Sequence, residues 1–183
     1  MPLKKIVTYG IDSLKEPSKT VENITDNTRR LINDMADTMY ETHGVGLAAP
    51  QIGVNLKIAV IDIDYSRKEK NNPGRNLRVF INPQIVWESD EDGPFNEGCL
   101  SVPDLDGEVY RPLKVKVNYR DEHFKQHTIE ADGLLARVLQ HEIDHLNGYL
   151  FVDRLSFLKR KMLAGQLHRL KKITRERNAS SEK

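Results

Sequence analysis

The sequence predicts an α+β fold, in which antiparallel β-sheets pack around one central helix and a further helix lies near each end of the chain. Three features indicate this fold. Apolar segments of strand length fill the middle of the 183-residue chain. A longer apolar run of helical composition, Leu134–Leu146, follows these segments instead of alternating with them. Strands that come first and a helix that comes afterwards are typical of α+β proteins.

The N-terminal helix is predicted over Ile24–Glu41, because apolar side chains recur there every three or four residues. Thr25 or Asp26 is the expected N-cap, and His43-Gly44 is expected to end the helix. The inward face of this helix should contain Leu31, Ile32, Met35 and Met39.

Four segments with apolar runs or apolar–polar alternation are predicted as strands: Lys57–Ile63, Val79–Trp87, Leu113–Arg120 and Phe124–Glu130. The second is interrupted at Pro83, because proline cannot donate to a β-ladder. The fourth returns as the hairpin partner of the third. The polar stretch Tyr65–Asn76 is expected to be a mobile loop.

The central helix is predicted from Leu134 to Leu146, because this run contains no Gly or Pro and is rich in helix formers. Gly133 lies just before it and Asn147-Gly148 just after it, which is a common way for a helix to end. Two adjoining apolar stripes should make the helix almost wholly buried. Its polar side chains then need partners, because unpaired buried polar groups are costly.

This helix contains the pattern H-E-x-x-H, at positions 141 to 145. Residues four apart share one helix face, so His141 and His145 can bind one metal ion. Glu142 can then reach a metal-bound water as a general base, which suggests a metallohydrolase. The pattern also occurs by chance, and two helical histidines can simply be solvated. A third ligand therefore decides the interpretation.

A catalytic site of this type needs a third protein ligand and an open position for water. The extended pattern H-E-x-x-H-x-x-G-x-x-H is not completed, because Phe151 stands in place of the third histidine. The only later glutamates, Glu176 and Glu182, lie in a polar tail. The single cysteine, Cys99, lies in a predicted loop and is either a small buried hydrophobe or a thiolate ligand. A single cysteine also excludes an internal disulfide, which fits a reducing compartment.

Three segments together resemble the three motifs of peptide deformylases. They are, in order, Gly44–Gly53 (GVGLAAPQIG), Glu97–Ser101 (EGCLS) and Gln140–Leu146 (QHEIDHL). The resemblance runs from the N-terminus to about Leu155. It implies a metal-dependent hydrolase that removes the N-terminal formyl group from the formyl-methionine of newly synthesised polypeptides and releases formate.

The resemblance implies that Cys99, His141 and His145 bind one divalent metal ion and that Glu142 is the general base. The ligands alone favour tetrahedral Zn(II), although Fe(II), Ni(II) and Co(II) also bind such a set. The resemblance points to Fe(II) as the physiological ion, for which Zn(II), Ni(II) or Co(II) can substitute.

The same resemblance implies the other site residues. Gln51 and the backbone N–H of Leu100 would bind the oxyanion of the reaction. Glu97 and Arg111 would form an ion pair that supports the cysteine segment, instead of being two unrelated surface charges. The groove for the formylated peptide would be lined by backbone that pairs with the peptide and by side chains that contact its methionine, namely Gly44, Val45 and Gly46, and Leu134 and Val138.

Residues 1–183 are expected to form one catalytic domain, with 157–183 as a basic C-terminal helix and polar tail. The apolar stripe of this helix should dock on the domain, and it comprises Leu158, Met162, Leu167 and Leu170. A weaker hypothesis is that its basic face contacts ribosomal RNA, because the implied substrate emerges from the ribosome. The net charge of +1 gives no argument for general nucleic-acid binding.

No apolar run approaches the length of a transmembrane helix, so no membrane partner is expected. The first residues leave no room for a signal peptide. We therefore expect a cytoplasmic bacterial protein, or an organelle protein if a transit peptide has been removed.

Two other functions remain open from the residues alone: a zinc endopeptidase of another H-E-x-x-H type, and a non-catalytic metal-stabilised domain. Phe151 and the lack of a downstream glutamate ligand argue against the first. A structural site usually has four protein ligands, and Asp144 lies on the wrong side of the helix to be the fourth. The acidic run Asp104–Glu108 stands where many relatives carry a basic residue, which leaves the preferred peptide sequence open.

Overall fold

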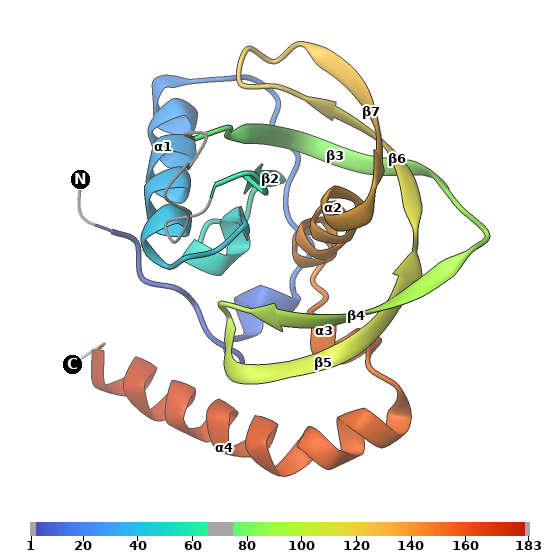
Figure 1. Ribbon diagram of the computed structural model, residues 1–183. Helices are drawn as coiled ribbons and strands as arrows, with labels where there is room; N and C mark the ends of the chain where they lie inside the picture. The colour runs from blue at the N-terminus through green and yellow to red at the C-terminus, as the bar shows by residue number, and fades with distance from the viewer. Residues whose placement is uncertain (1–2, 66–74, 182–183) are drawn as a thin grey trace.

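The computed structural model describes residues 3–65 and 75–181 (Figure 1). Its helices are α1 (Asp26–Glu41), α2 (Gly133–Leu146), α3 (Phe151–Arg154) and α4 (Phe157–Ser181), with the 3-10 turns η1 (Asp12–Lys15) and η2 (Ala49–Ile52). Its strands are β1 (Gly46–Ala48), β2 (Ile58–Ile61), β3 (Arg78–Glu88), β4 (Asp92–Cys99), β5 (Val102–Pro112), β6 (Lys114–Arg120) and β7 (Gln126–Asp132).

Helix α2 lies at the centre of the molecule, between two antiparallel sheets (Figure 1). A five-stranded sheet with the order β1-β2-β3-β6-β7 lies on one side of it, and the two-stranded sheet β4-β5 lies on the other. Helix α1 packs beside β1 and β2, and α4 runs along the outside of the β4-β5 sheet. This arrangement confirms the α+β fold and the central position of the H-E-x-x-H helix.

Helix α2 is buried because it is apolar around most of its circumference. Leu139 and Ile143 pack with Phe80 of β3 and with Val115 and Val117 of β6. Its bounds differ by one residue from the predicted ones, because Gly133 already belongs to the helix. The helix therefore reaches the centre of the domain as a rigid support for the polar residues that it carries.

Helix α1 begins where the sequence indicates. The Thr25 hydroxyl accepts a hydrogen bond from the Thr28 backbone N–H at 3.2 Å, which satisfies a free donor of the first turn. Ile32, Met35 and Met39 are buried against β1 and β2. The helix thus fixes the position of the segment that follows it, which leads directly into β1.

The predicted interruption at Pro83 is a β-bulge, not the end of a strand. The pairing of β3 with β6 shifts between Ile81 and Gln84, and Asn82 adopts a positive φ of 51°. The Asn82 side chain bonds to Val21 through both its oxygen and its nitrogen, at 2.9 and 2.8 Å. The strand continues past the proline because the bulge removes the need for a donor there.

The prediction that Cys99 lies in a loop needs correction, and the prediction of a loop at Tyr65–Asn76 is largely untested. Cys99 does not lie in an open loop but ends β4, in a tight hairpin with β5. The sequence of β4 shows no apolar–polar alternation, because the buried residues of this strand are Gly93 and Glu97, neither of which has an apolar side chain. Most of the predicted loop Tyr65–Asn76 lies outside the described residues.

The apolar stripe predicted for α4 is half wrong. Leu167 is 5% exposed, but Leu158 and Met162 are 68% and 74% exposed. The helix docks through a face that starts at Leu163 and continues through Leu167 and Leu170. Leu163 lies four residues before Leu167, so both side chains lie on the same helix face. Met162 lies on another face and points away from the domain.

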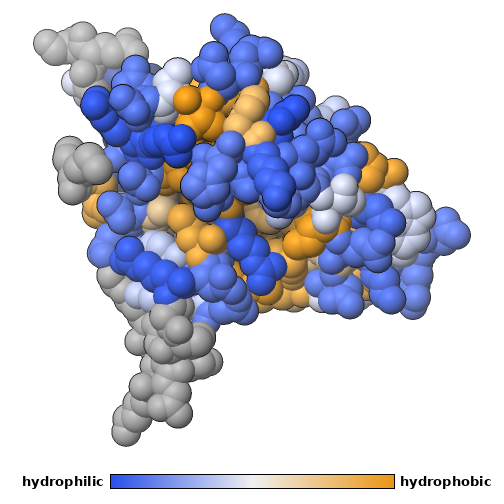
Figure 2. All heavy atoms as spheres, turned by 90° about the horizontal axis from the view of Figure 1, so that it is seen from above, coloured by the Kyte–Doolittle hydropathy of each residue, from blue (hydrophilic) through white to orange (hydrophobic). Residues whose placement is uncertain are grey.

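The surface seen from above is mainly hydrophilic, and hydrophobic side chains reach it only in small patches separated by polar ones (Figure 2). In the described part of the chain, no helix is long and apolar enough to span a membrane.

Candidate metal centre and active site

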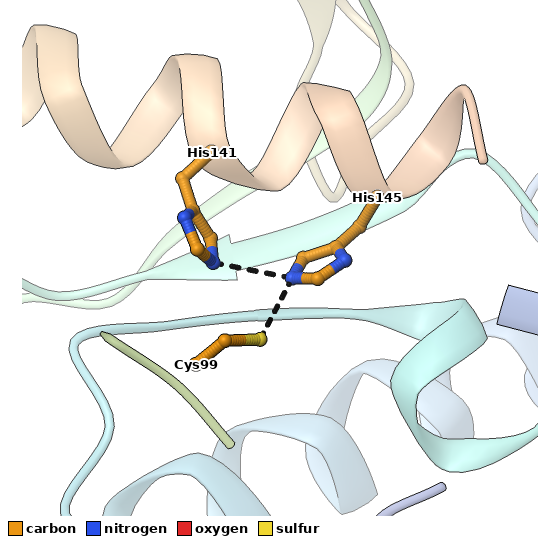
Figure 3. A group of neighbouring side chains, drawn as sticks. All are labelled: Cys99, His141 and His145. Atoms are coloured by element: carbon orange, nitrogen blue, oxygen red, sulfur yellow. Dashed lines mark hydrogen bonds between the residues drawn. The ribbon is translucent and has the colours of Figure 1, made fainter. Parts of the chain in front are cut away.

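Three metal-ligating side chains meet at the centre of the domain (Figure 3). His141 and His145 extend from one face of α2, and Cys99 approaches them from the end of β4. The His145 Nε2 atom lies 3.2 Å from Cys99 Sγ and 3.2 Å from His141 Nε2. All three donor atoms lie within 4.8 Å of one another. Within the described residues this is the one group of at least three such side chains.

The two separations at His145 are close to those between donors on a single metal ion. A tetrahedral ion at about 2.0–2.1 Å from nitrogen and 2.3 Å from sulfur separates two nitrogens by roughly 3.3 Å and a nitrogen from the sulfur by roughly 3.6 Å. Burial and the neighbouring His141 hold the pKa of His145 well below its ordinary value, so its imidazole is neutral and offers a lone pair. Cys99, His141 and His145 could therefore hold one metal ion together.

His141 is oriented by Glu97. Its Nδ1 atom lies 2.9 Å from Glu97 Oε2, so Nδ1–H donates to the carboxylate. Burial acts to lower the pKa of His141, but its bonds to Cys99 and Glu97 outweigh burial and raise the pKa well above its ordinary value. A metal ion at Nε2 would therefore have to displace a proton. Glu97 in turn accepts two hydrogen bonds from Arg111, at 2.7 and 2.9 Å. Burial acts to raise the pKa of Glu97, but the bonds from His141 and Arg111 outweigh it and lower the pKa to about 2. Glu97 and Arg111 thus form a buried pair, as the sequence interpretation expected.

Sequence reasoning missed the part that Asp144 and Arg154 take in this network. Arg111 Nη1 donates to Asp144 Oδ2 at 2.7 Å, and Arg154 Nη2 donates to Asp144 Oδ1 at 2.6 Å. Asp144 faces away from the metal donors, as its place on the helix implies. The signal that could have revealed it is a carboxylate at a buried helix position, which requires a cationic partner.

Glu142 lies beside the three donors and is only 4% exposed. Its Oε2 atom has no hydrogen-bond partner among the described residues, although it is buried. Burial raises the pKa of Glu142 to about 7. A carboxylate with a free oxygen and a pKa near neutrality can both accept and return a proton.

Gln51 is held on η2 with its amide facing Cys99. Its Oε1 atom accepts from the Ala48 backbone N–H at 2.8 Å, which turns Nε2 toward Cys99 Sγ at 3.4 Å. The Ser101 backbone N–H also lies 3.4 Å from that sulfur. Two N–H donors therefore face the Cys99 sulfur. The part of Ser101 was not foreseen, because nothing in its residue type distinguishes it.

A groove of about 570 Å³ opens over these residues. Its lining includes Gln51, Cys99, His141 and Glu142. The predicted groove residues all line it, together with Leu100: Gly44, Val45, Gly46, Leu134 and Val138.

Several groove residues were not foreseen. Phe95 and Arg137 line it, and the guanidinium of Arg137 lies 5.6 Å from the centre of the Phe95 ring. Asp104, which has a positive φ of 62°, and Asp106 line the groove beside the shift in β4–β5 pairing. A bulge next to a site can re-aim side chains toward it, so the acidic segment noticed in the sequence faces the groove.

Comparisons with known proteins agree with this site. The family model described as polypeptide deformylase matches residues 3–161. A peptide deformylase of Bartonella quintana is 46% identical over 98% of this chain and 97% of its own length. The crystal structure of a peptide deformylase from Legionella pneumophila has a TM-score of 0.82 at 46% identity, and covers 94% of this chain and 97% of its own. One from Plasmodium falciparum has a TM-score of 0.86 at 37% identity, and covers 94% of this chain and 98% of its own. The chain belongs to the polypeptide deformylase family.

Proposed function

We propose that this enzyme removes the N-terminal formyl group from the formyl-methionine of new polypeptides and releases formate. The observation that carries the proposal is the convergence of Cys99, His141 and His145 next to a groove that Glu142 and Gln51 line. The family to which the chain belongs is metal-dependent. A zinc endopeptidase of another type is not favoured, because family membership covers nearly the whole chain.

The metal would be held by Cys99, His141 and His145. When bound, it would activate a water molecule and polarise the formyl carbonyl group. We propose Fe(II) as the physiological ion, with Zn(II), Ni(II) or Co(II) as substitutes, because a set of one thiolate and two imidazoles accepts each of these ions.

The protein side chains would move the proton and bind the developing charge. Glu142 would accept the proton of the attacking water and pass it to the departing amine nitrogen. The Gln51 Nε2 group and the backbone N–H of Leu100 would donate to the oxyanion as it forms. Because Ala48 fixes the carboxamide of Gln51, the donor is oriented before the substrate binds.

The groove would select a formylated methionine at the start of an extended peptide. The side chains of Leu134, which is 42% exposed, and Val138 offer an apolar surface for the flexible methionine side chain. Gly44, Val45 and Gly46 would present backbone to the peptide, as an added strand does. Glu97 and Arg111 would keep His141 and the β4 segment in place.

We propose further that residues 1–183 act as one catalytic domain in the bacterial cytoplasm, or in an organelle if a transit peptide has been removed.

The basic helix α4 and polar tail, residues 157–183, would contact ribosomal RNA near the emerging substrate. Truncation after Arg160 should then abolish co-sedimentation with ribosomes. Unchanged co-sedimentation would exclude this role.

The experiment that tests the function is formate release from formyl-Met-Ala-Ser by anaerobically purified protein, with the metal content of the same sample. We expect rapid release and about one ion per chain, as a site with three protein ligands requires. Bound metal without formate release would contradict the proposal. Protein that lacks metal is first reconstituted with Fe(II), Ni(II) or Zn(II).

A further inference from the structure

A buried carboxylate that the mechanism does not use lies behind the groove. Asp62, directly after β2, is 1% exposed. No Lys or Arg among the described residues forms an ion pair with it. A buried charge without a cation is costly unless hydrogen bonds satisfy it, so the partners of Asp62 indicate what it does.

Four donors from three parts of the chain satisfy this carboxylate. Oδ2 accepts from the Tyr40 hydroxyl and from the Asn76 backbone N–H, both at 2.7 Å. Oδ1 accepts from the backbone N–H groups of Asp64 and Tyr65, both at 3.1 Å. Hydrogen bonds to an ionised acceptor are the strong ones. Asp62 therefore ties the last turns of α1 to the chain on both sides of residues 66–74.

The backbone of the same residue holds the wall of the groove. The Asp62 N–H donates to the Val45 carbonyl at 2.9 Å, next to the pairing of Gly46 with Ile61. Val45 is 40% exposed and lines the groove. Gly46 lies so close to Glu142 that a Cβ built on it would be 2.5 Å from Oε1. A small shift of the Asp62 backbone would thus move Val45 and Gly46, which line the groove, relative to Glu142.

We propose that Asp62 is a positioning residue for peptide binding, which fixes the Val45–Gly46 backbone along which the formylated peptide lies. This inference rests on the proposed function. The Asp62 carboxylate sets the position of the Asp62 backbone N–H, and that N–H sets the position of Val45. A formyl-methionine substrate with no further residues touches little of this wall, whereas a longer peptide runs along it.

The test is the variant Asp62→Asn, which keeps the side-chain shape but turns one acceptor oxygen into a donor. The new side-chain NH₂ group then faces N–H or O–H groups that donated to the carboxylate, and this mismatch is buried. We measure kcat/KM for formyl-Met-Ala-Ser and for formyl-methionine amide. The ratio of the two should fall about tenfold, mainly through KM of the tripeptide, if one strong hydrogen bond is lost from the wall.

Asp64→Asn is the matched control. It is the same chemical change two residues away, at a side chain that is 41% exposed and bonds to the Asn76 side chain at 2.6 Å. Its substrate ratio should equal that of the parent protein. Tyr40→Phe removes a single donor to Asp62 and keeps the three backbone donors. Tyr40→Phe should also lower the substrate ratio, but by less than Asp62→Asn does.

A role in stability alone would lower the unfolding temperature of Asp62→Asn and leave the substrate ratio unchanged, which would overturn the proposal. If Asp62→Asn does not fold, an unchanged ratio in Tyr40→Phe overturns it equally. Hydrogen exchange gives a second readout, because the Asp62 amide should lose protection in both variants. Failure of the parent protein to release formate from formyl-Met-Ala-Ser would instead contradict the proposed function.

Discussion

Substitution of Gly46 by alanine should disable Glu142, the proposed general base, while the metal stays bound. A Cβ at this position would lie 2.5 Å from Glu142 Oε1 and 2.9 Å from Val138 Cγ1. The carboxylate must retreat by about 0.9 Å to restore an ordinary contact of 3.4 Å. Glu142 is buried on a packed helix, so it cannot move along the reaction direction without a change of side-chain conformation. A displacement of about 1 Å in a reacting group can reduce the rate about 10²-fold.

The assay compares Gly46→Ala with the parent protein in kcat and KM for formyl-Met-Ala-Ser. We expect kcat to fall about 10²-fold and KM to rise as well, because Val138 is also displaced. Metal content should stay at the parental level, since Cys99, His141 and His145 keep their contacts. The matched control is Gly98→Ala in the same groove, where the nearest atom to the added Cβ is Leu105 O at 3.9 Å.

A parental kcat in Gly46→Ala would contradict the expected displacement of Glu142. Loss of the metal would contradict it as well, because the ligands would then depend on Gly46 more than Glu142 does. Equal damage in Gly98→Ala would mean that any added methyl group in the groove blocks the substrate.

Four further predictions test the site. Glu142→Ala should keep stoichiometric metal and lose nearly all turnover, and an active variant would show that the general base lies elsewhere. Cys99→Ala should lose the metal itself, measured by elemental analysis of the purified protein. Asp144→Asn should lower the free energy of unfolding, measured in urea, by about 3 kcal/mol, because it leaves Arg111 partly unpaired in a buried site. A loss below about 1 kcal/mol would show that the contacts of Asp144 with Arg111 and Arg154 contribute little to stability. Asp104 lines the groove, so its negative charge should favour lysine over glutamate downstream of the formyl-methionine. Asp104→Asn should reduce that preference, and an unchanged preference would place this carboxylate outside the path of the peptide.

The sequence predicts α2 well because both of its signals are local. Its apolar period and its flanking glycines specify a helix, and His141 and His145 share a face by geometry alone. The convergence of Cys99 on that face came from the family resemblance, because no local pattern brings positions 99 and 145 together. The motif resemblance also led to Gln51, whose carboxamide is oriented only in the folded chain.

The network behind the site could not be read from the sequence. Asp144 and Arg154 meet because α3 turns back against α2, and the tertiary contact has no periodic signature. The β4–β5 hairpin was missed because its buried positions are mostly not apolar. In β5 burial alternates at Gly107, Val109 and Arg111, but only Val109 carries an apolar side chain. The error in α4 concerns Leu158 and Met162, which are both exposed. Met162 and Leu163 are both apolar, and only packing decides which of them faces the domain.

The separation of the three metal donors along the chain has a consequence for how the enzyme is assembled. Cys99 lies 46 residues before His145, whereas the two histidines are four residues apart. An unfolded chain therefore offers an ion only the local histidine pair, and the thiolate joins after a long loop has closed, at an entropic cost that grows with loop length. Contacts of such high sequence separation form slowly. Tight metal capture should thus be a late folding event, so that an ion held against a chelator marks a chain whose β4–β5 hairpin has already docked on α2.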